Sequence, residues 1–167
     1  MRISVIFWSL FFLGLSSGSL AQNQQARLQQ ELAEVGLSQF TASNYKPGRV
    51  KHIVLFRYAP GVSAQKQHAV VEAFLALKDS HRNGVPYIDS IEAGEQNSGE
   101  GADGGYSQGF IVTFRSEGDR NYYVGSPIVN DANYYDKAHA AFKAFVGPLL
   151  AKSQGALVFD LSIKADK

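Results

Sequence analysis

The feature that most constrains this chain is the order of its apolar segments between residues 51 and 163. Short segments rich in β-branched and aromatic residues predict strands. Longer segments with apolar residues at helical spacing predict helices. The predicted elements are a strand at 51–58, a helix at 63–79, strands at 87–95 and 106–114, a short helix at 116–123, a helix from about 138 to 155 and a strand at 157–163.

Without the short helix, this order is β-α-β-β-α-β, which predicts an α+β protein with the ferredoxin-like arrangement. Such a sheet carries both helices on one face. The first strand is apolar on both sides, with Val54 and Phe56 on one side and Ile53 and Leu55 on the other. A helix-free face bearing those side chains would be a large exposed apolar patch. We therefore expect a homodimer with Ile53 and Leu55 at the interface between two sheets.

The N-terminus has the pattern of a cleavable secretory signal peptide over residues 1–21. A basic start at Arg2 precedes an uncharged apolar run, and small residues follow at Ser19 and Ala21. The apolar run is shorter than the roughly 20 residues that a membrane span needs, so an uncleaved anchor is the weaker alternative. We expect cleavage after Ala21 and a periplasmic or secreted protein with no stable membrane span.

Residues 22–49 are predicted to be a Gln-rich lead-in and linker. Leu28, Leu32 and Val35 have the spacing of a short amphipathic helix that ends near Gly36. The segment from residue 41 to 49 is predicted to be extended. A disordered tail over residues 22–40 is the alternative that this composition allows.

The composition excludes several classes of protein. The chain has no cysteine, so an exported form must be stabilised by an ordinary apolar core without disulfides. Its 16 basic and 15 acidic residues nearly balance, which offers no electrostatic reason to expect nucleic acid or an anionic membrane as a partner.

Four segments, in this order, resemble the stress-responsive dimeric α/β-barrel (Dabb) family over residues 51–163. They are Lys51–Tyr58 followed by Pro60-Gly61-Val62, Gly105-Tyr106 with Val112-Thr113-Phe114, Ala138–Phe142, and Val158-Phe159-Asp160. The resemblance implies a Dabb-like domain over residues 50–164, a dimer of ferredoxin-like folds, and a pocket between sheet and helices in each subunit. Most members have no assigned activity. One plant member is a polyketide cyclase that uses a tyrosine and a histidine.

The first function hypothesis is the binding of a small apolar or aromatic molecule in that sheet–helix pocket. The side chains predicted to line the pocket are His52, Val54, Phe56, Phe74, Phe110 and Phe142.

The second hypothesis is a lyase or cyclase that acts on a polyketide-like carbonyl substrate. His139 shares a helix face with Phe142, so it points toward the core and could act as a general base, while Tyr123 polarises the carbonyl. The cyclase-like pattern Tyr-x-x-x-Pro-x-His is broken here, because an inserted stretch separates Pro127 from His139. Tyr134 or Tyr135 could therefore replace Tyr123 in the pocket.

The third hypothesis is a structural stress-related dimer with a filled core. In that case His52 and His139 are structural histidines, bonded to the backbone or to a carboxylate such as Asp160. No metal site is expected, since no histidine or carboxylate spacing matches one. No cofactor is expected either, because a haem bound by His139 would rest on analogy of fold alone.

Overall fold

The main sheet contains four antiparallel strands in the order β4-β5-β1-β6. The computed structural model describes residues 18–163, with side chains from Gln24 onward, so residues 1–17 of the predicted signal peptide lie outside it. The elements are α1 (Gly18–Phe40), β1 (Pro47–Phe56), α2 (Ala64–Ala76), a 3-10 turn (Leu77–Asp79), β2 (His81–Arg82), β3 (Val85–Pro86), β4 (Ile88–Glu95), β5 (Gln108–Ser116), α3 (Glu117–Val124), α4 (Lys137–Val146), a second 3-10 turn (Gly147–Leu149) and β6 (Ala156–Ser162).

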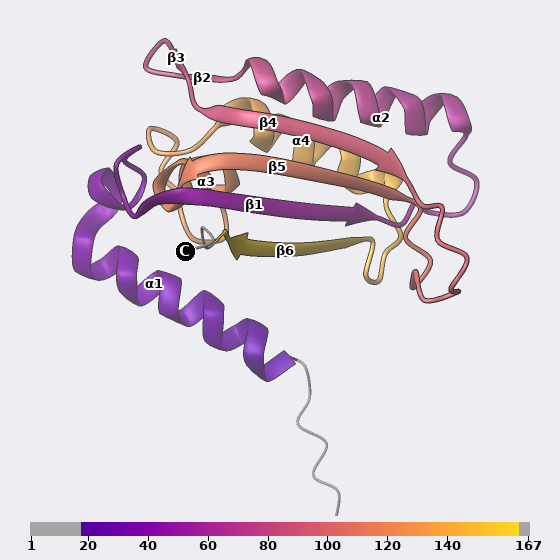
Figure 1. Cartoon of the computed structure of the whole chain (residues 1–167), viewed down its shortest axis with the longest axis horizontal. Coiled ribbons are helices and arrows are strands. Elements are labelled where there is room, and N and C mark those ends of the chain that lie inside the picture. The colour runs from indigo at the N-terminus through magenta and orange to yellow at the C-terminus, as the bar shows by residue number, and fades with distance from the viewer. Residues whose placement is uncertain (1–17, 164–167) are drawn as a thin grey trace, which may run out of the picture.

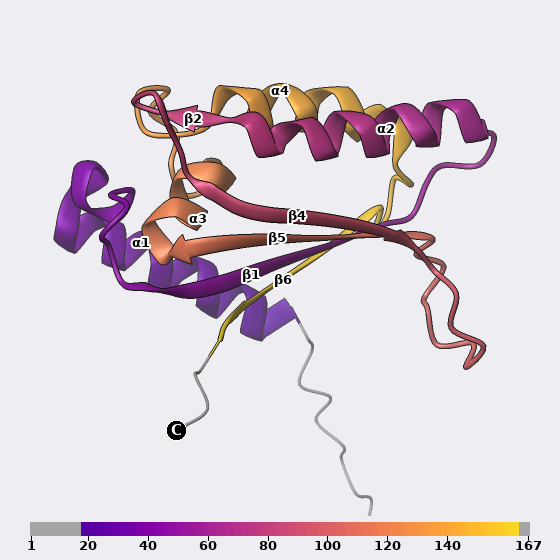
Figure 2. The ribbon, with the colours of Figure 1, turned by 45° about the horizontal axis from the view of Figure 1, so that its top comes forward.

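The strand order and the two long helices confirm the ferredoxin-like α+β prediction. Helices α2 and α4 lie side by side on one face of the sheet, and the opposite face carries no helix (Figures 1 and 2). The short helix α3 lies at one end of that helical layer. The core therefore forms between the sheet and the helices.

Local sequence signals explain most element boundaries. Ser63 caps α2 by accepting a hydrogen bond from the backbone N–H of Lys66, as its position before the apolar stripe predicts. The predicted end of the last helix at Gly155 is wrong, since α4 ends at Val146 and a 3-10 turn follows. Pro148 explains the difference, because its ring cannot donate the next helical hydrogen bond.

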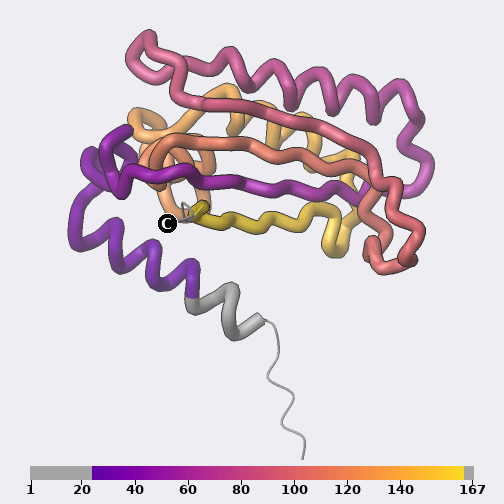
Figure 3. The backbone as a smooth tube through the Cα atoms, viewed as in Figure 1, coloured from indigo at the N-terminus to yellow at the C-terminus, as the bar shows by residue number. Residues whose placement is uncertain are grey.

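The N-terminal segment is more ordered than the sequence indicated. Gly36 has φ 76° and kinks α1, but helix resumes after it and ends at Phe40 rather than near Gly36. The predicted extended linker is also shorter, because turns follow Phe40 and β1 already begins at Pro47. Figure 3 shows this segment, in indigo, at the same end of the sheet as the orange loop after α3.

A second apolar cluster fixes the N-terminal segment to the domain. Phe40, Tyr45 and Val129 form its buried centre. Side chains from α1, from the turn that follows it and from the stretch after α3 pack around them: Leu28, Leu32, Leu37, Ala42, Ile128, Tyr134 and Tyr135. The N-terminal segment and the inserted stretch thus share one small core.

The helix-free face of the sheet is apolar, as predicted. Ile53 and Leu55 are partly exposed on it, and neighbouring Phe159 on β6 is 58% exposed. No helix within residues 18–163 is both long enough and apolar enough to cross a membrane.

Candidate functional site

Three aromatic side chains meet between β1, α3 and α4. The ring of His139 stacks on the ring of Tyr123, with 3.8 Å between ring centroids and 15° between ring planes. The ring of His52 meets Tyr123 edge-on at 5.7 Å. All three are buried, with exposed fractions of 4% for His52, 1% for Tyr123 and 7% for His139. We call this set the His–Tyr cluster.

The fold places His139 through the start of α4. Asp136 caps this helix by accepting hydrogen bonds from the backbone N–H groups of Ala138 and His139. The hydroxyl of Tyr87 in turn donates a hydrogen bond to the Asp136 carboxylate. The imidazole then lies against α3, where its Nδ1 is 2.6 Å from the carbonyl oxygen of Tyr123. Because a carbonyl only accepts, Nδ1 carries the proton and Nε2 presents a lone pair.

His52 is oriented by a carboxylate. It alternates with Val54 on the inner face of β1, opposite Asp160 on β6. Its Nδ1 is 2.6 Å from Asp160 Oδ1, and Arg120 donates to the other carboxylate oxygen. Burial raises the pKa of Asp160, but the hydrogen bond and charge of His52 and the charge of Arg120 lower it overall. Asp160 is therefore ionised, and His52 donates through Nδ1 and leaves Nε2 free.

Burial shifts the pKa of two members of the cluster, His139 and Tyr123. Burial lowers the pKa of His139 to about 3, despite its hydrogen bond to the Tyr123 carbonyl. At neutral pH the His139 imidazole is therefore uncharged. Burial also raises the pKa of Tyr123 far above its usual range, so its hydroxyl stays protonated. That hydroxyl has no hydrogen-bond partner among the described residues.

The structure decides which tyrosine meets His139. Tyr134 and Tyr135, the alternatives to Tyr123, pack instead around the second core with Phe40. The inserted stretch therefore loops away from the cluster, and Tyr123 and His139 come together despite the broken spacing.

The predicted pocket residues pack against one another. Val54 is buried beside them, and the four phenylalanine rings form one continuous cluster in which Phe74 and Phe110 stack with 3.9 Å between ring centroids. Phe142 contacts Phe74 edge-on at 5.1 Å, and Phe56 lies 5.3 Å from Phe110. Side chains of the protein itself thus fill this end of the sheet–helix layer.

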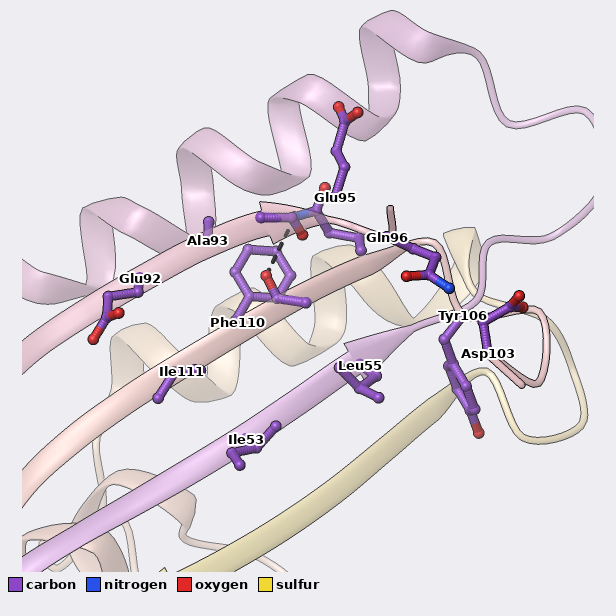
Figure 4. A pocket seen from close by; sticks show the side chains of 13 residues that line it. Ile53, Leu55, Glu92, Ala93, Glu95, Gln96, Asp103, Tyr106, Phe110 and Ile111 are labelled. Atoms are coloured by element: carbon purple, nitrogen blue, oxygen red, sulfur yellow. Dashed lines mark hydrogen bonds between the residues drawn. The ribbon is translucent and has the colours of Figure 1, made fainter. Parts of the chain in front are cut away.

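A hollow of about 450 Å³ lies on the helix-free face. Ile53 and Leu55 line it from β1, and Tyr106, in the loop between β4 and β5, lies at one end of it (Figure 4). Gly94 and Gly109, which are paired across β4 and β5, also line it and leave space because they carry no side chains. The two residues predicted at a dimer interface therefore border this hollow, on the opposite side of the sheet from the His–Tyr cluster.

The described residues contain no group of three or more histidines, cysteines or carboxylates arranged to hold a metal ion.

Sequence reasoning paired Tyr123 with His139, but it named His52 only as a pocket-lining or structural residue. It mentioned Asp160 only as a possible partner for a structural histidine. The position of Asp160 in an otherwise apolar strand was a signal that it has a charged or polar partner, since carboxylates are rarely buried without one. Arg120 was missed, because nothing in its local sequence indicates that its guanidinium is buried.

Comparisons with known proteins agree with this architecture. The model of the stress-responsive A/B barrel domain (Dabb) family matches residues 50–163. A crystal structure of an Arabidopsis thaliana protein is 24% identical, with a TM-score of 0.55 over 71% of this chain and 98% of that chain. A hydroxynitrile lyase from Passiflora edulis is 21% identical, with a TM-score of 0.54 over 72% and 98% of the two chains.

A dimeric ferredoxin-like protein of unknown function from Jannaschia sp. is 18% identical, with a TM-score of 0.52 over 70% of this chain and all of that chain. No curated protein matched the sequence. The fold defines an α+β protein of the ferredoxin-like class. Since the family model covers most of the chain, the protein belongs to the stress-responsive A/B barrel domain family.

Proposed function

We propose that this protein is an exported, homodimeric acid–base enzyme of the lyase or cyclase type. Its substrate class is a small carbonyl compound of the polyketide kind. The observation that carries the proposal is the gathering of polar atoms without protein partners in one buried cluster. These are the Tyr123 hydroxyl, which is buried without a hydrogen-bond partner among residues 18–163, and Nε2 of His52 and of His139, the ring nitrogens that do not contact Asp160 or the Tyr123 carbonyl.

The geometry favours His52, rather than His139, as the base. An imidazole whose pKa is about 3 takes up a proton poorly at neutral pH. His52 instead has an ionised carboxylate on its Nδ1–H, which fixes the tautomer and stabilises the cation formed when Nε2 takes a proton. His139 would then accept a hydrogen bond through Nε2 and orient the substrate.

The proposed reaction is an aldol-type step. Nε2 of His52 takes a proton from the carbon beside a carbonyl, and the resulting enolate attacks a second carbonyl carbon of the same substrate. Formation of the new carbon–carbon bond leaves a negative charge on the oxygen of the attacked carbonyl. This oxygen accepts a hydrogen bond from the Tyr123 hydroxyl and then takes the proton from Nε2 of His52. Run in reverse, the same groups cleave such a bond, which is the lyase direction.

Dimerisation is supported by the helix-free face. Leu157, Phe159 and Ile163 leave 40%, 58% and 39% of their surfaces exposed beside Ile53 and Leu55. A second copy that packs on this face would bury them, as large apolar homodimer interfaces do. The related ferredoxin-like protein from Jannaschia sp. is described as dimeric.

The test is an activity screen with matched variants. Two substrates are tested. With a linear poly-β-ketone, formation of the cyclised product is measured; with the cyanohydrin of an aromatic aldehyde, release of the aldehyde is measured. His52→Gln is expected to lower kcat by about 100-fold or more. Tyr123→Phe is expected to lower kcat by a similar factor, because it removes the hydroxyl that donates a hydrogen bond to the negative substrate oxygen. The control is His68→Gln on the exposed side of α2. Equal rates in wild type and His52→Gln would refute the proposal.

A second candidate is the structural dimer with a filled core. It is supported by the stacked phenylalanines and by the partners of both histidines, a backbone carbonyl and a carboxylate. Under this alternative no substrate is turned over, and His52→Gln changes only the free energy of unfolding. The binding of a small apolar ligand in the sheet–helix layer, or of a substrate at the His–Tyr cluster, would require buried side chains to move apart.

A further inference from the structure

A continuous chain of charged contacts joins the N-terminal helix to His52. It begins at Glu31 of α1, which pairs with Lys46 just before β1. Lys46 Nζ lies 3.8 Å from Glu117 Oε2 at the start of α3, and the same oxygen lies 3.9 Å from Arg120 Nη2.

Arg120 then pairs with the carboxylate that holds His52. Its Nη1 bonds Asp160 Oδ2, while the other carboxylate oxygen accepts from His52. The Arg120 side chain at the centre of these contacts is only 10% exposed, and Asp160 is 27% exposed. The outer pairs are weaker, because Lys46 is about half exposed.

A second path leads from Arg120 to the N-terminal segment. Arg120 Nε donates to Asn121 Oδ1 at 2.9 Å, and Asn121 Nδ2 donates to the backbone carbonyl of Phe40 at 2.8 Å. The backbone N–H of Glu117 also donates to the carbonyl of Lys46. Both neighbours of the guanidinium are therefore anchored on residues that precede the matched family region, which starts at residue 50.

From these contacts we infer that Arg120 is a positioning residue for His52, and that residues 24–46 hold Arg120 in place. A carboxylate bound on one oxygen alone can rotate about its last side-chain bond. Arg120 occupies the second oxygen of Asp160 and so fixes the first oxygen toward Nδ1 of His52. The N-terminal segment is thus part of the site's support. The inference rests on the proposed function only in taking His52 as the base.

The measurable consequence is the tautomer of His52. With Asp160 held in place, the neutral ring carries its proton on Nδ1 alone. Nitrogen-15 NMR of the imidazole distinguishes a protonated from an unprotonated ring nitrogen. His139 is an internal reporter, because its Nδ1–H bond to the Tyr123 carbonyl involves none of the charged residues. The resonances are assigned with His52→Gln and His139→Gln.

In Arg120→Met, His52 is expected to change from one tautomer to a mixture of two, while His139 keeps its Nδ1–H form. Arg120→Lys keeps the charge but cannot contact Asp160 and Asn121 together, so a mixture is expected there too. Lys46→Met and Asn121→Ala should give a smaller shift in the same direction. Glu72→Gln, in the exposed pair with His68, is the control that leaves His52 unchanged.

A single Nδ1–H tautomer of His52 in Arg120→Met, with His139 unchanged, would overturn the inference. If His52 keeps a single Nδ1–H tautomer in both Lys46→Met and Asn121→Ala, the N-terminal segment does not help to hold Arg120 in place. If Arg120→Met fails to fold, as altered His139 resonances would reveal, Arg120→Lys decides the question. These results do not depend on turnover, so a failure of the proposed enzyme activity would leave them standing.

Discussion

Replacing Gly118 by alanine should dislodge the N-terminal segment from the domain. A Cβ at this position would lie 1.8 Å from the carbonyl oxygen of Ala42 and 2.9 Å from Tyr45 Cβ. Because carbon and oxygen approach to only about 3.3 Å, the segment would have to move by roughly 1.5 Å. That movement would break the backbone hydrogen bonds from Gly118 to Tyr45 and from Glu117 to Lys46, both 3.1 Å long.

The size of the effect follows from these losses. Overpacking costs about 1–3 kcal/mol, and each backbone hydrogen bond contributes about 1 kcal/mol. Since the segment can relax by moving away, we expect a total loss of about 2–4 kcal/mol in the free energy of unfolding. At a urea dependence of about 2 kcal/mol per M, the unfolding midpoint should fall by roughly 1–2 M.

The assay is urea unfolding followed by circular dichroism, at one protein concentration because a dimer's stability depends on it. The matched control is Gly147→Ala. Its added Cβ would meet nothing within 4 Å, and its φ of −47° suits any residue. An unchanged midpoint in Gly118→Ala would refute the close packing of the N-terminal segment on α3.

Three further predictions test the assembly, the buried histidine and the export. Leu55→Lys should give a monomer or an insoluble protein, because burying an unpaired ammonium is costly; a wild-type mass of one subunit by light scattering at micromolar concentration would contradict the dimer. His139 has its pKa lowered by burial to about 3, so the unfolded chain binds a proton that the folded chain does not. Stability should therefore fall as pH drops from about 6.5 to 3, by up to about 1.4 kcal/mol per pH unit, and His139→Gln should flatten that slope in urea titrations. The mature protein should begin at Gln22 by intact mass, and a membrane-bound form that retains Met1 would disprove signal-peptide cleavage.

Much of the fold could be predicted because its signals are local. Alternation along Lys51–Tyr58 predicts a strand with two apolar sides, and helical spacing placed His139 on the same side as Phe142. Ser63 caps its helix through its own side chain, three residues from the donor. Each of these depends on residues close in the chain, so the sequence carries the information directly.

The site depended on contacts that no local pattern records. The choice of Tyr123 over Tyr134 was decided by where the inserted stretch packs, and Phe40, 94 residues earlier than Tyr134 in the numbering, takes part in that packing. Arg120 is buried only because α3, β6 and the N-terminal segment converge on it.

The sequence by itself determined the order of elements, the apolar helix-free face and the inward direction of both histidines. Only the tertiary structure decided the hydrogen-bond partners and surroundings of these histidines. An imidazole's proton affinity depends on burial and on its hydrogen-bond partners, and these come from residues far along the chain. For this reason two histidines with the same inward position differ in their surroundings. Burial lowers the pKa of His139 to about 3, whereas the ring of His52 donates a hydrogen bond to the Asp160 carboxylate.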